Sequence, residues 1–88
     1  MAFGLGGGSM DDKDLINKLY LLERRDFIEL SNGEIVEVII REGKYNLFSI
    51  KRELWFDEDM GIHEFVKATA SKLREENLGI IDVLKYRA

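Results

Sequence analysis

The segment WFDEDMGIHEF (residues 55–65) holds the only histidine of the chain, His63, among several carboxylates. Imidazole and carboxylate groups bind divalent metals and act as general acids and bases, so this segment is the first candidate for chemistry. A zinc site normally needs further imidazole or thiolate ligands, and the 88 residues contain one His and no Cys. The oxygen-ligand spacing of a calcium loop is absent as well, so we expect no metal site. The carboxylates of the segment are Asp57, Glu58, Asp59 and Glu64.

The same residue types are typical of the first turn of a helix. Free N–H groups and positive partial charge at a helix N-terminus favour carboxylates nearby. We predict Asp59 as the N-cap residue, and Glu64 as a reciprocal cap if the helix begins at Gly61. His63 then lies at the rim of the apolar stripe of the helix and stays largely solvated. We interpret the segment as structural, with a partner contact as the next alternative and metal binding or catalysis as the least favoured one.

A catalytic nucleophile is hard to assemble from the remaining residues. Ser31, Ser49 and Ser71 do not lie in a nucleophile-elbow motif. Chance pairs of carboxylates are common in a chain with 17 Asp and Glu residues. A chain of this size also offers little scaffold for a substrate pocket. We expect no enzymatic activity, no catalytic residues and no cofactor.

A second group of residues combines cations with aromatic rings, a composition that can stack single-stranded bases. Tyr45 and Phe48 differ by an odd number of positions, so on a strand they point to opposite faces. The formal net charge of −4 disfavours a general nucleic-acid binder but leaves a local basic patch open. Single-stranded nucleic-acid binding therefore remains the alternative function. The predicted patch consists of Arg41, Lys44, Lys51, Arg52 and Trp55.

Composition predicts one folded domain preceded by a leader. Hydrophobic residues make up 45% and charged residues 34% of the chain, which is typical of a globular domain. Residues 1–9 carry no charge and contain four of the eight glycines, so we expect a tag-like or flexible leader before a single domain at 10–88. No apolar run approaches the ~18 residues of a membrane span. With no cysteine to oxidise, we take the cytoplasm as the default compartment.

Two helices are predicted from apolar residues at helical spacing. Residues 10–26 present Leu15, Leu19 and Leu22 on one side, and residues 61–77 carry a narrow apolar stripe. We expect Gly79 as a left-handed cap after the second helix. The tail at 80–87 is most simply a last strand, with a short helix as the alternative. The stripe of the second helix consists of Ile62, Phe65, Val66, Thr69, Ala70 and Leu73.

The chain between the helices predicts an antiparallel meander. Asn32-Gly33 is a strong turn signal, and a three-residue loop at 31–33 with Gly33 in a left-handed bulge keeps the apolar residues on one face. A turn at Glu42-Gly43 leads into a third strand, which we expect to bend near residues 51–52 into a short fourth. The predicted fold class is therefore α+β, with the order α-β-β-β-α-β and a sheet of three or four strands plus the C-terminal strand. The face expected to lie under the helices carries Ile28, Leu30, Val36, Val38 and Ile40.

The other face of this sheet is also partly apolar, and it is the feature that points most clearly to function. If both helices cover the first face, the second stays exposed; if they lie on opposite faces, both are hidden. Exposed apolar patches of this extent usually mark interfaces. We expect a small non-enzymatic interaction module, of the type of an accessory or inhibitor protein, that forms a homodimer or binds another protein. The predicted interface consists of Phe27, Ile35, Ile39, Phe48 and Ile50.

Overall fold

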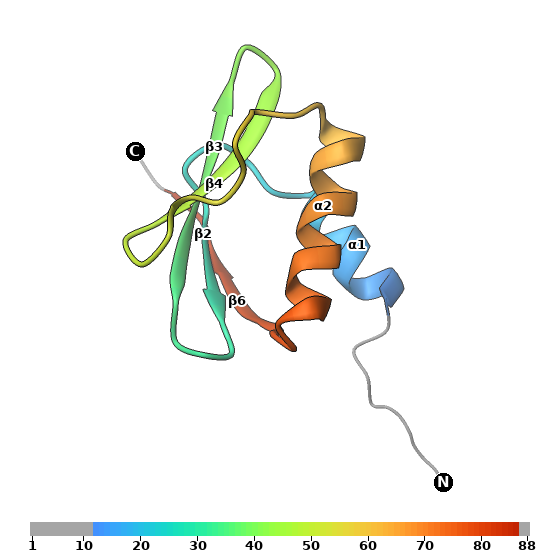
Figure 1. The fold of residues 1–88 in the computed structure, drawn as a ribbon, viewed down its shortest axis with the longest axis vertical. Helices are drawn as coiled ribbons and strands as arrows, with labels where there is room; N and C mark the ends of the chain where they lie inside the picture. Colours follow the sequence, from blue (N-terminus) through green and yellow to red (C-terminus); the bar gives the residue numbers. More distant parts are fainter. Residues whose placement is uncertain (1–11, 87–88) are drawn as a thin grey trace, which may run out of the picture.

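Two helices and a five-stranded antiparallel sheet make up the fold, in the α+β order predicted from the sequence (Figure 1). The computed structural model describes residues 12–86; the predicted leader at 1–9 and the start of the domain at residue 10 lie outside this range. Along the sheet the strands are ordered β5-β4-β3-β2-β6, so the last strand pairs with the first. The elements are α1 (Asp12–Tyr20), β2 (Phe27–Leu30), β3 (Ile35–Arg41), β4 (Lys44–Ser49), β5 (Glu53–Leu54), α2 (Ile62–Glu75) and β6 (Ile80–Leu84).

The β2–β3 hairpin has the predicted three-residue loop. Ile28 lies opposite Val36, and the Leu30 N–H donates to the carbonyl of Glu34 at 2.9 Å. Gly33 has a φ of +89°, the left-handed conformation that closes such a loop and that glycine adopts without steric cost. This register fixes which side chains of both strands face the helices.

The β3–β4 hairpin closes at Glu42-Gly43, as predicted, with Arg41 opposite Lys44. Glu42 and Gly43 have φ values of 53° and 75°, as the tight turns that suit the twist of a hairpin require. After β4 the chain bends and returns as the two-residue strand β5, which pairs with the end of β4. The expected bend near residues 51–52 is therefore confirmed.

Helix α1 is shorter than predicted, because the chain turns before it reaches β2. The helix ends at Tyr20 rather than near residue 26. The buried carboxylate of Asp26 accepts a hydrogen bond from the Glu23 N–H at 2.8 Å and one from the Lys85 ammonium at 2.8 Å. Arg25 adopts a left-handed φ of 71° in this turn. The apolar spacing continues to Leu22, which is buried, but Leu22 reaches the core from the turn and not from the helix.

Helix α2 has the predicted apolar stripe but a different C-terminal cap. Asn77, with a φ of 59°, is the left-handed residue, and Gly79 is not among the residues with positive φ. The N–H of Leu78 donates to the carbonyl of Leu73, and the N–H of Asn77 donates to that of Arg74, at 2.8 and 3.1 Å. This pair of bonds is a Schellman motif, and Asn is the residue after Gly that best tolerates its left-handed position.

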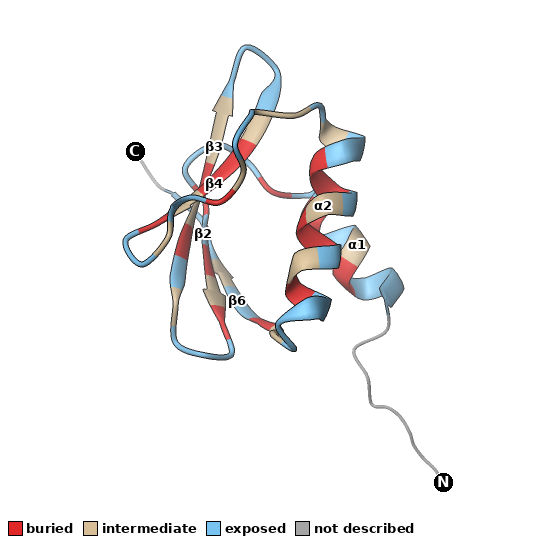
Figure 2. Ribbon diagram, viewed as in Figure 1, coloured by how far each residue is buried: buried red, intermediate tan, exposed pale blue. Residues whose placement is uncertain are grey.

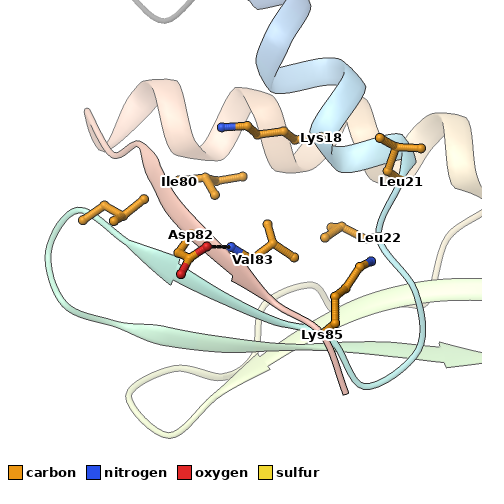
Figure 3. A pocket seen from close by; sticks show the side chains of 8 residues that line it. Lys18, Leu21, Leu22, Ile80, Asp82, Val83 and Lys85 are labelled. Atoms are coloured by element: carbon orange, nitrogen blue, oxygen red, sulfur yellow. Dashed lines mark hydrogen bonds between the residues drawn. The ribbon is translucent and has the colours of Figure 1, made fainter. Parts of the chain in front are cut away.

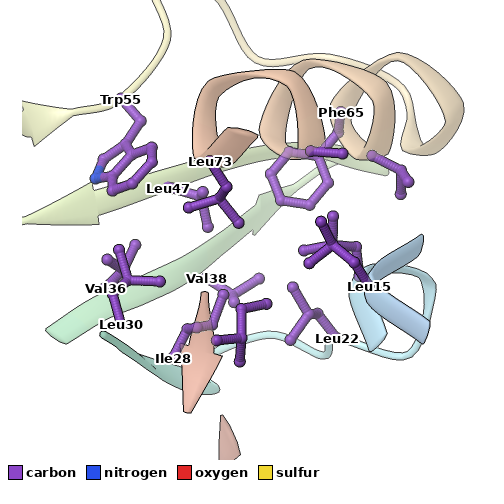
Figure 4. Packing of buried hydrophobic residues seen from close by; sticks show 14 residues of the cluster. Leu15, Leu22, Ile28, Leu30, Val36, Val38, Leu47, Trp55, Phe65 and Leu73 are labelled. Carbon is purple, nitrogen blue, oxygen red and sulfur yellow. The ribbon is translucent and has the colours of Figure 1, made fainter. Parts of the chain in front are cut away.

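Both helices lie on the same side of the sheet, and the hydrophobic core fills the space between the helices and the sheet (Figures 1 and 2). The two aromatic rings of Tyr45 and Phe65 meet there, with centroids 5.2 Å apart. The alternative with one helix on each face is thereby excluded, and the second sheet face has no helix over it. The buried hydrophobic residues drawn in Figure 4 are Leu15, Leu19, Leu22, Ile28, Leu30, Val36, Val38, Leu47, Trp55, Phe65, Val66, Ala70, Leu73 and Ile80.

Candidate interaction surface

The face of the sheet that carries no helix is called the open face. A row of side chains on it crosses all five strands, and beside the row Asn46 of β4 is buried by its contacts with residues 56 and 59. In this row Phe27 lies opposite Glu37, and Glu37 lies opposite Phe48. Leu54 on β5 and Leu84 on β6 extend the row to both edges of the sheet. Phe27, Leu54 and Leu84 are 37%, 48% and 46% exposed, which is high for large apolar side chains within strands. The row is therefore apolar except for Glu37 at its centre.

A shallow hollow of about 230 Å³ lies on the open face, between Glu37 and the end of the sheet where β3 begins and β4 ends. Its lining brings together four of the five predicted interface residues. The fifth, Ile39, is half-buried and lies two positions along β3 from Glu37. Ile50 follows β4 and is the most exposed of the set, at 92%. The lining residues are Phe27, Ile35, Glu37, Phe48, Ser49 and Ile50.

Leu54 and Leu84 belong to this surface, although the sequence pattern does not assign them to it. Strand β5 has two residues, too few for an alternating pattern to appear. In β6 an irregularity between Glu29 and Leu30 of the paired strand shifts the register, so that alternation from Ile80 no longer predicts the outward residues. The turn signals around both strands are visible in the sequence, but the outward positions are not.

Two cations stand at one end of the open face, where the β3–β4 hairpin closes. Arg41 and Lys44 are directly opposite each other and both are exposed. The Arg41 guanidinium lies 3.2 Å from the carboxylate of Asp59, and its side chain keeps 62% of its surface exposed. The pKa of Asp59 is lowered, first by the hydrogen bond from Asn46 and then by the charge of Arg41. This exposed pair leaves Arg41 accessible to a second carboxylate.

Arg52 and Trp55 from the predicted nucleic-acid patch are engaged inside the fold. The Arg52 guanidinium contacts Glu34 at 2.9 Å and Glu76 at 2.6 Å, and these hydrogen bonds, with that of Glu76 first, raise its pKa. Trp55 is 7% exposed, and its indole N–H donates to Ser49 Oγ at 3.2 Å. The indole is therefore not presented to a base. Arg41, Lys44 and Lys51 remain at the surface.

His63 lies on the exposed side of α2, where it contacts α1. Its Nδ1 is 2.8 Å from the hydroxyl of Tyr20, and the two rings meet edge to face with centroids 5.6 Å apart. The N-cap of α2 is Gly61, without a hydrogen bond from a capping side chain, so the predicted caps by Asp59 and Glu64 are wrong. The reason is that Asp59 is held two residues before the cap, where its carboxylate accepts hydrogen bonds from Asn46 and Arg41.

Neither a metal cluster nor a membrane span is found between residues 12 and 86. No three His, Cys, Asp or Glu residues within that range lie close enough together to hold a metal ion. None of the helices in the same range is long and apolar enough to cross a membrane.

A second hollow, of about 340 Å³, lies between the end of α1 and the free edge of β6 (Figure 3). Leu21, 72% exposed, and Leu22 line it from the α1 side, and Ile80 and Val83 line it from β6. An unpaired strand edge can accept another strand. Here the N–H of Val83 already donates to the carboxylate of Asp82 at 2.9 Å, so this edge is partly closed by its own side chain.

No protein-family model matches the chain, and neither a curated protein nor a solved structure matches it. The surface of the chain itself therefore supplies the indications of function.

Proposed function

We propose that this protein is a non-enzymatic interaction module that self-associates through the open face of its sheet. The observation that carries the proposal is the row of side chains from Leu54 to Leu84 across the sheet, apolar except for Glu37, with both helices on the other face. Burying such residues releases ~25 cal/mol per Å² of apolar surface removed from water. Monomeric proteins rarely leave a contiguous apolar patch of this kind in water.

A second copy is the partner that we favour. Every copy presents the same apolar row, and two such rows bury each other when the sheets stack face to face, as in β-sandwiches. A strand partner at the edge of β6 is less favoured, because Asp82 occupies the Val83 N–H. Single-stranded nucleic acid is also less favoured, because Trp55 is buried and Arg52 is paired with two carboxylates. We place the homodimer in the cytoplasm, since the chain has no cysteine that needs an oxidising compartment.

Light scattering and sedimentation equilibrium over a wide range of concentrations test the proposal. We expect a monomer–dimer equilibrium that Ile39→Lys shifts strongly toward the monomer, because the substitution replaces an apolar contact of the face with an ammonium group that would lose its water on association. Leu21→Lys is the matched control: Leu21 is apolar and more exposed than the open-face strand residues, and it lines the other hollow. Circular dichroism shows whether each variant remains folded.

A wild-type protein that stays monomeric at every concentration refutes self-association. If Leu21→Lys abolishes dimerisation and Ile39→Lys leaves it intact, the interface lies at the second hollow, between the end of α1 and β6. If the protein stays monomeric and binds a single-stranded oligonucleotide with an affinity that falls as salt rises, the result supports nucleic-acid binding instead, because counterion release weakens such binding at high salt.

A further inference from the structure

We propose that the second copy docks with its strands antiparallel to those of the first, about a two-fold axis that crosses the strands at Ile39, so that Glu37 of each copy meets Arg41 of the other. This arrangement rests on the proposed self-association and specifies its geometry. The axis lies between the two stacked sheets and runs perpendicular to the strands. Residues at equal distances on either side of Ile39 are therefore brought face to face.

The central strand of the sheet carries a self-complementary pattern on the open face. Strand β3 is third of the five strands, and it presents Glu37, Ile39 and Arg41 at alternate positions. Glu37 and Arg41 are each two residues from Ile39, roughly 6.6 Å along the strand. Reversing the strand about Ile39 thus places the carboxylate of one copy over the guanidinium of the other, twice per dimer.

The neighbouring strand β4 places an aromatic ring and a cation on either side of Asn46, whose buried side chain donates hydrogen bonds to the Phe56 carbonyl and the Asp59 carboxylate. Phe48 is the cross-strand partner of Glu37, and Lys44 is the cross-strand partner of Arg41. The axis that brings Glu37 to Arg41 of the second copy therefore also brings Phe48 toward Lys44 of that copy. An ammonium over a phenyl ring is an attractive contact. The hollow bordered by Phe27, Glu37 and Phe48 thus receives the hairpin end that carries both cations.

The charges in the monomer leave room for this exchange. Glu37 is half-buried between its cross-strand partners Phe27 and Phe48. Within residues 12–86 its carboxylate has no ion pair at 4.0 Å or less. Covering it with apolar surface would cost free energy unless a cation came with the partner. Arg41 can supply that cation, because its pair with Asp59 is exposed and such pairs contribute little.

The opposite arrangement, with the axis along the strands, brings like charges together. It stacks Glu37 of one copy near Glu37 of the other and Arg41 near Arg41, which disfavours it. Stacked sheets lie ~10 Å apart and are rotated by ~30° because of their twist. Glutamate and arginine side chains are long enough to meet across that gap, whereas the shorter apolar side chains fill it.

A charge-exchange experiment tests the arrangement with the full chain. Glu37→Lys places cation opposite cation at both contacts of the dimer, and Arg41→Glu places carboxylate opposite carboxylate. We expect each variant alone to dimerise more weakly than the wild type by about tenfold or more. Mixing the two variants should restore association as a heterodimer, because the two substituted positions then face each other with opposite charges at one contact and the native Glu37–Arg41 pair forms at the other. Sedimentation velocity with one variant fluorescently labelled measures the three affinities.

The controls separate the arrangement from the proposed self-association. Asp59→Asn removes the charged internal partner of Arg41 and leaves Glu37, Ile39 and Arg41 in place, so dimerisation should persist in this variant. One outcome would be that the wild type dimerises, that Ile39→Lys abolishes the dimer, and that mixing the two charge variants restores no association. This outcome would support the interface but overturn the antiparallel arrangement. A wild type that never dimerises overturns both. Recovery on mixing, with both variants folded by circular dichroism, supports the pairing of Glu37 with Arg41.

Discussion

The guanidinium of Arg52 lies over the indole of Trp55, 4.2 Å from its ring centroid, and closes one end of the core. The same guanidinium joins Glu34, next to the β2–β3 loop, to Glu76 at the end of α2. One side chain therefore ties the hairpin, the turn before β5 and the second helix together. Because the Glu34 side chain is only 5% exposed, its charge depends on this partner.

Replacing Arg52 with Ala should lower the free energy of unfolding by about 2–3 kcal/mol, because it leaves the carboxylate of Glu34 without its charged donor. Arg41→Ala is the matched control, since it breaks an ion pair that is largely exposed and should cost less than about 1 kcal/mol. Urea unfolding followed by tryptophan fluorescence and by circular dichroism measures both. Equal losses in the two variants would show that the Arg52 cluster is no stronger than a surface pair.

The same cluster predicts a loss of stability in acid. Burial raises the pKa of Glu34, but the hydrogen bonds from Arg52, Ser49 and Asn32 together outweigh it and hold the pKa below its ordinary value of 4.5. The hydrogen bond from Arg52 lowers the pKa of Glu76 as well. A carboxyl whose pKa is lower in the folded state stabilises the fold above its unfolded pKa and loses that contribution as the pH falls through its folded pKa.

The free energy of unfolding, measured from pH 7 down to pH 3, should therefore begin to decrease once the pH drops under about 4.5, the unfolded pKa of these glutamates. Glu34→Gln removes one of the titrating groups and should flatten the curve over the acidic range. An acid limb that is unchanged in Glu34→Gln would assign the loss to other carboxylates.

The strands and their facing were predictable from the sequence because turn chemistry and alternation agreed. Asn32-Gly33 and Glu42-Gly43 fixed both hairpins, and a slip of one residue would have turned Val36 and Val38 out of the core. The helix ends were less predictable, because tertiary contacts decide them. Apolar spacing continues past Tyr20, yet the hydrogen bonds of Asp26 turn the chain there.

The candidate surface was predictable where alternation was long enough to show. Phe27, Ile35 and Phe48 follow from the registers of β2, β3 and β4. The burial of Trp55 did not follow from local pattern, because it depends on Arg52 bridging two segments that are distant in the sequence. A single aromatic residue beside cations has the same local appearance whether the cations face solvent or close over the ring.

Thr69→Val should stabilise the protein. Thr69 is 1% exposed, and its Oγ1 has no hydrogen-bond partner within residues 12–86. Valine has nearly the same shape and removes the unsatisfied hydroxyl, so we expect a gain of about 1 kcal/mol. Thr69→Ser keeps the hydroxyl and deletes the methyl group, and should instead destabilise by about 1 kcal/mol. Thermal and urea unfolding measure the stability of both variants. If the valine variant were less stable than the serine variant, the Thr69 hydroxyl would not be an unsatisfied group.

Gly33→Ala should destabilise the β2–β3 hairpin through the backbone alone. Gly33 has a φ of +89°, and a Cβ placed on it meets nothing within 4 Å, so the cost comes from the left-handed conformation and not from a clash. We expect a loss of about 1–2 kcal/mol. Gly33→Asn should recover much of it, because asparagine tolerates this conformation. Urea unfolding of both variants measures these effects. An alanine variant as stable as the wild type would show that this loop does not need a left-handed residue.

Gly33 itself is not part of the proposed interface, although its loop sets the register that places Ile35 and Glu37 on the open face. We therefore expect Gly33→Ala to weaken the proposed dimer only in proportion to the fraction of the chain that it unfolds, and sedimentation of the variant measures this.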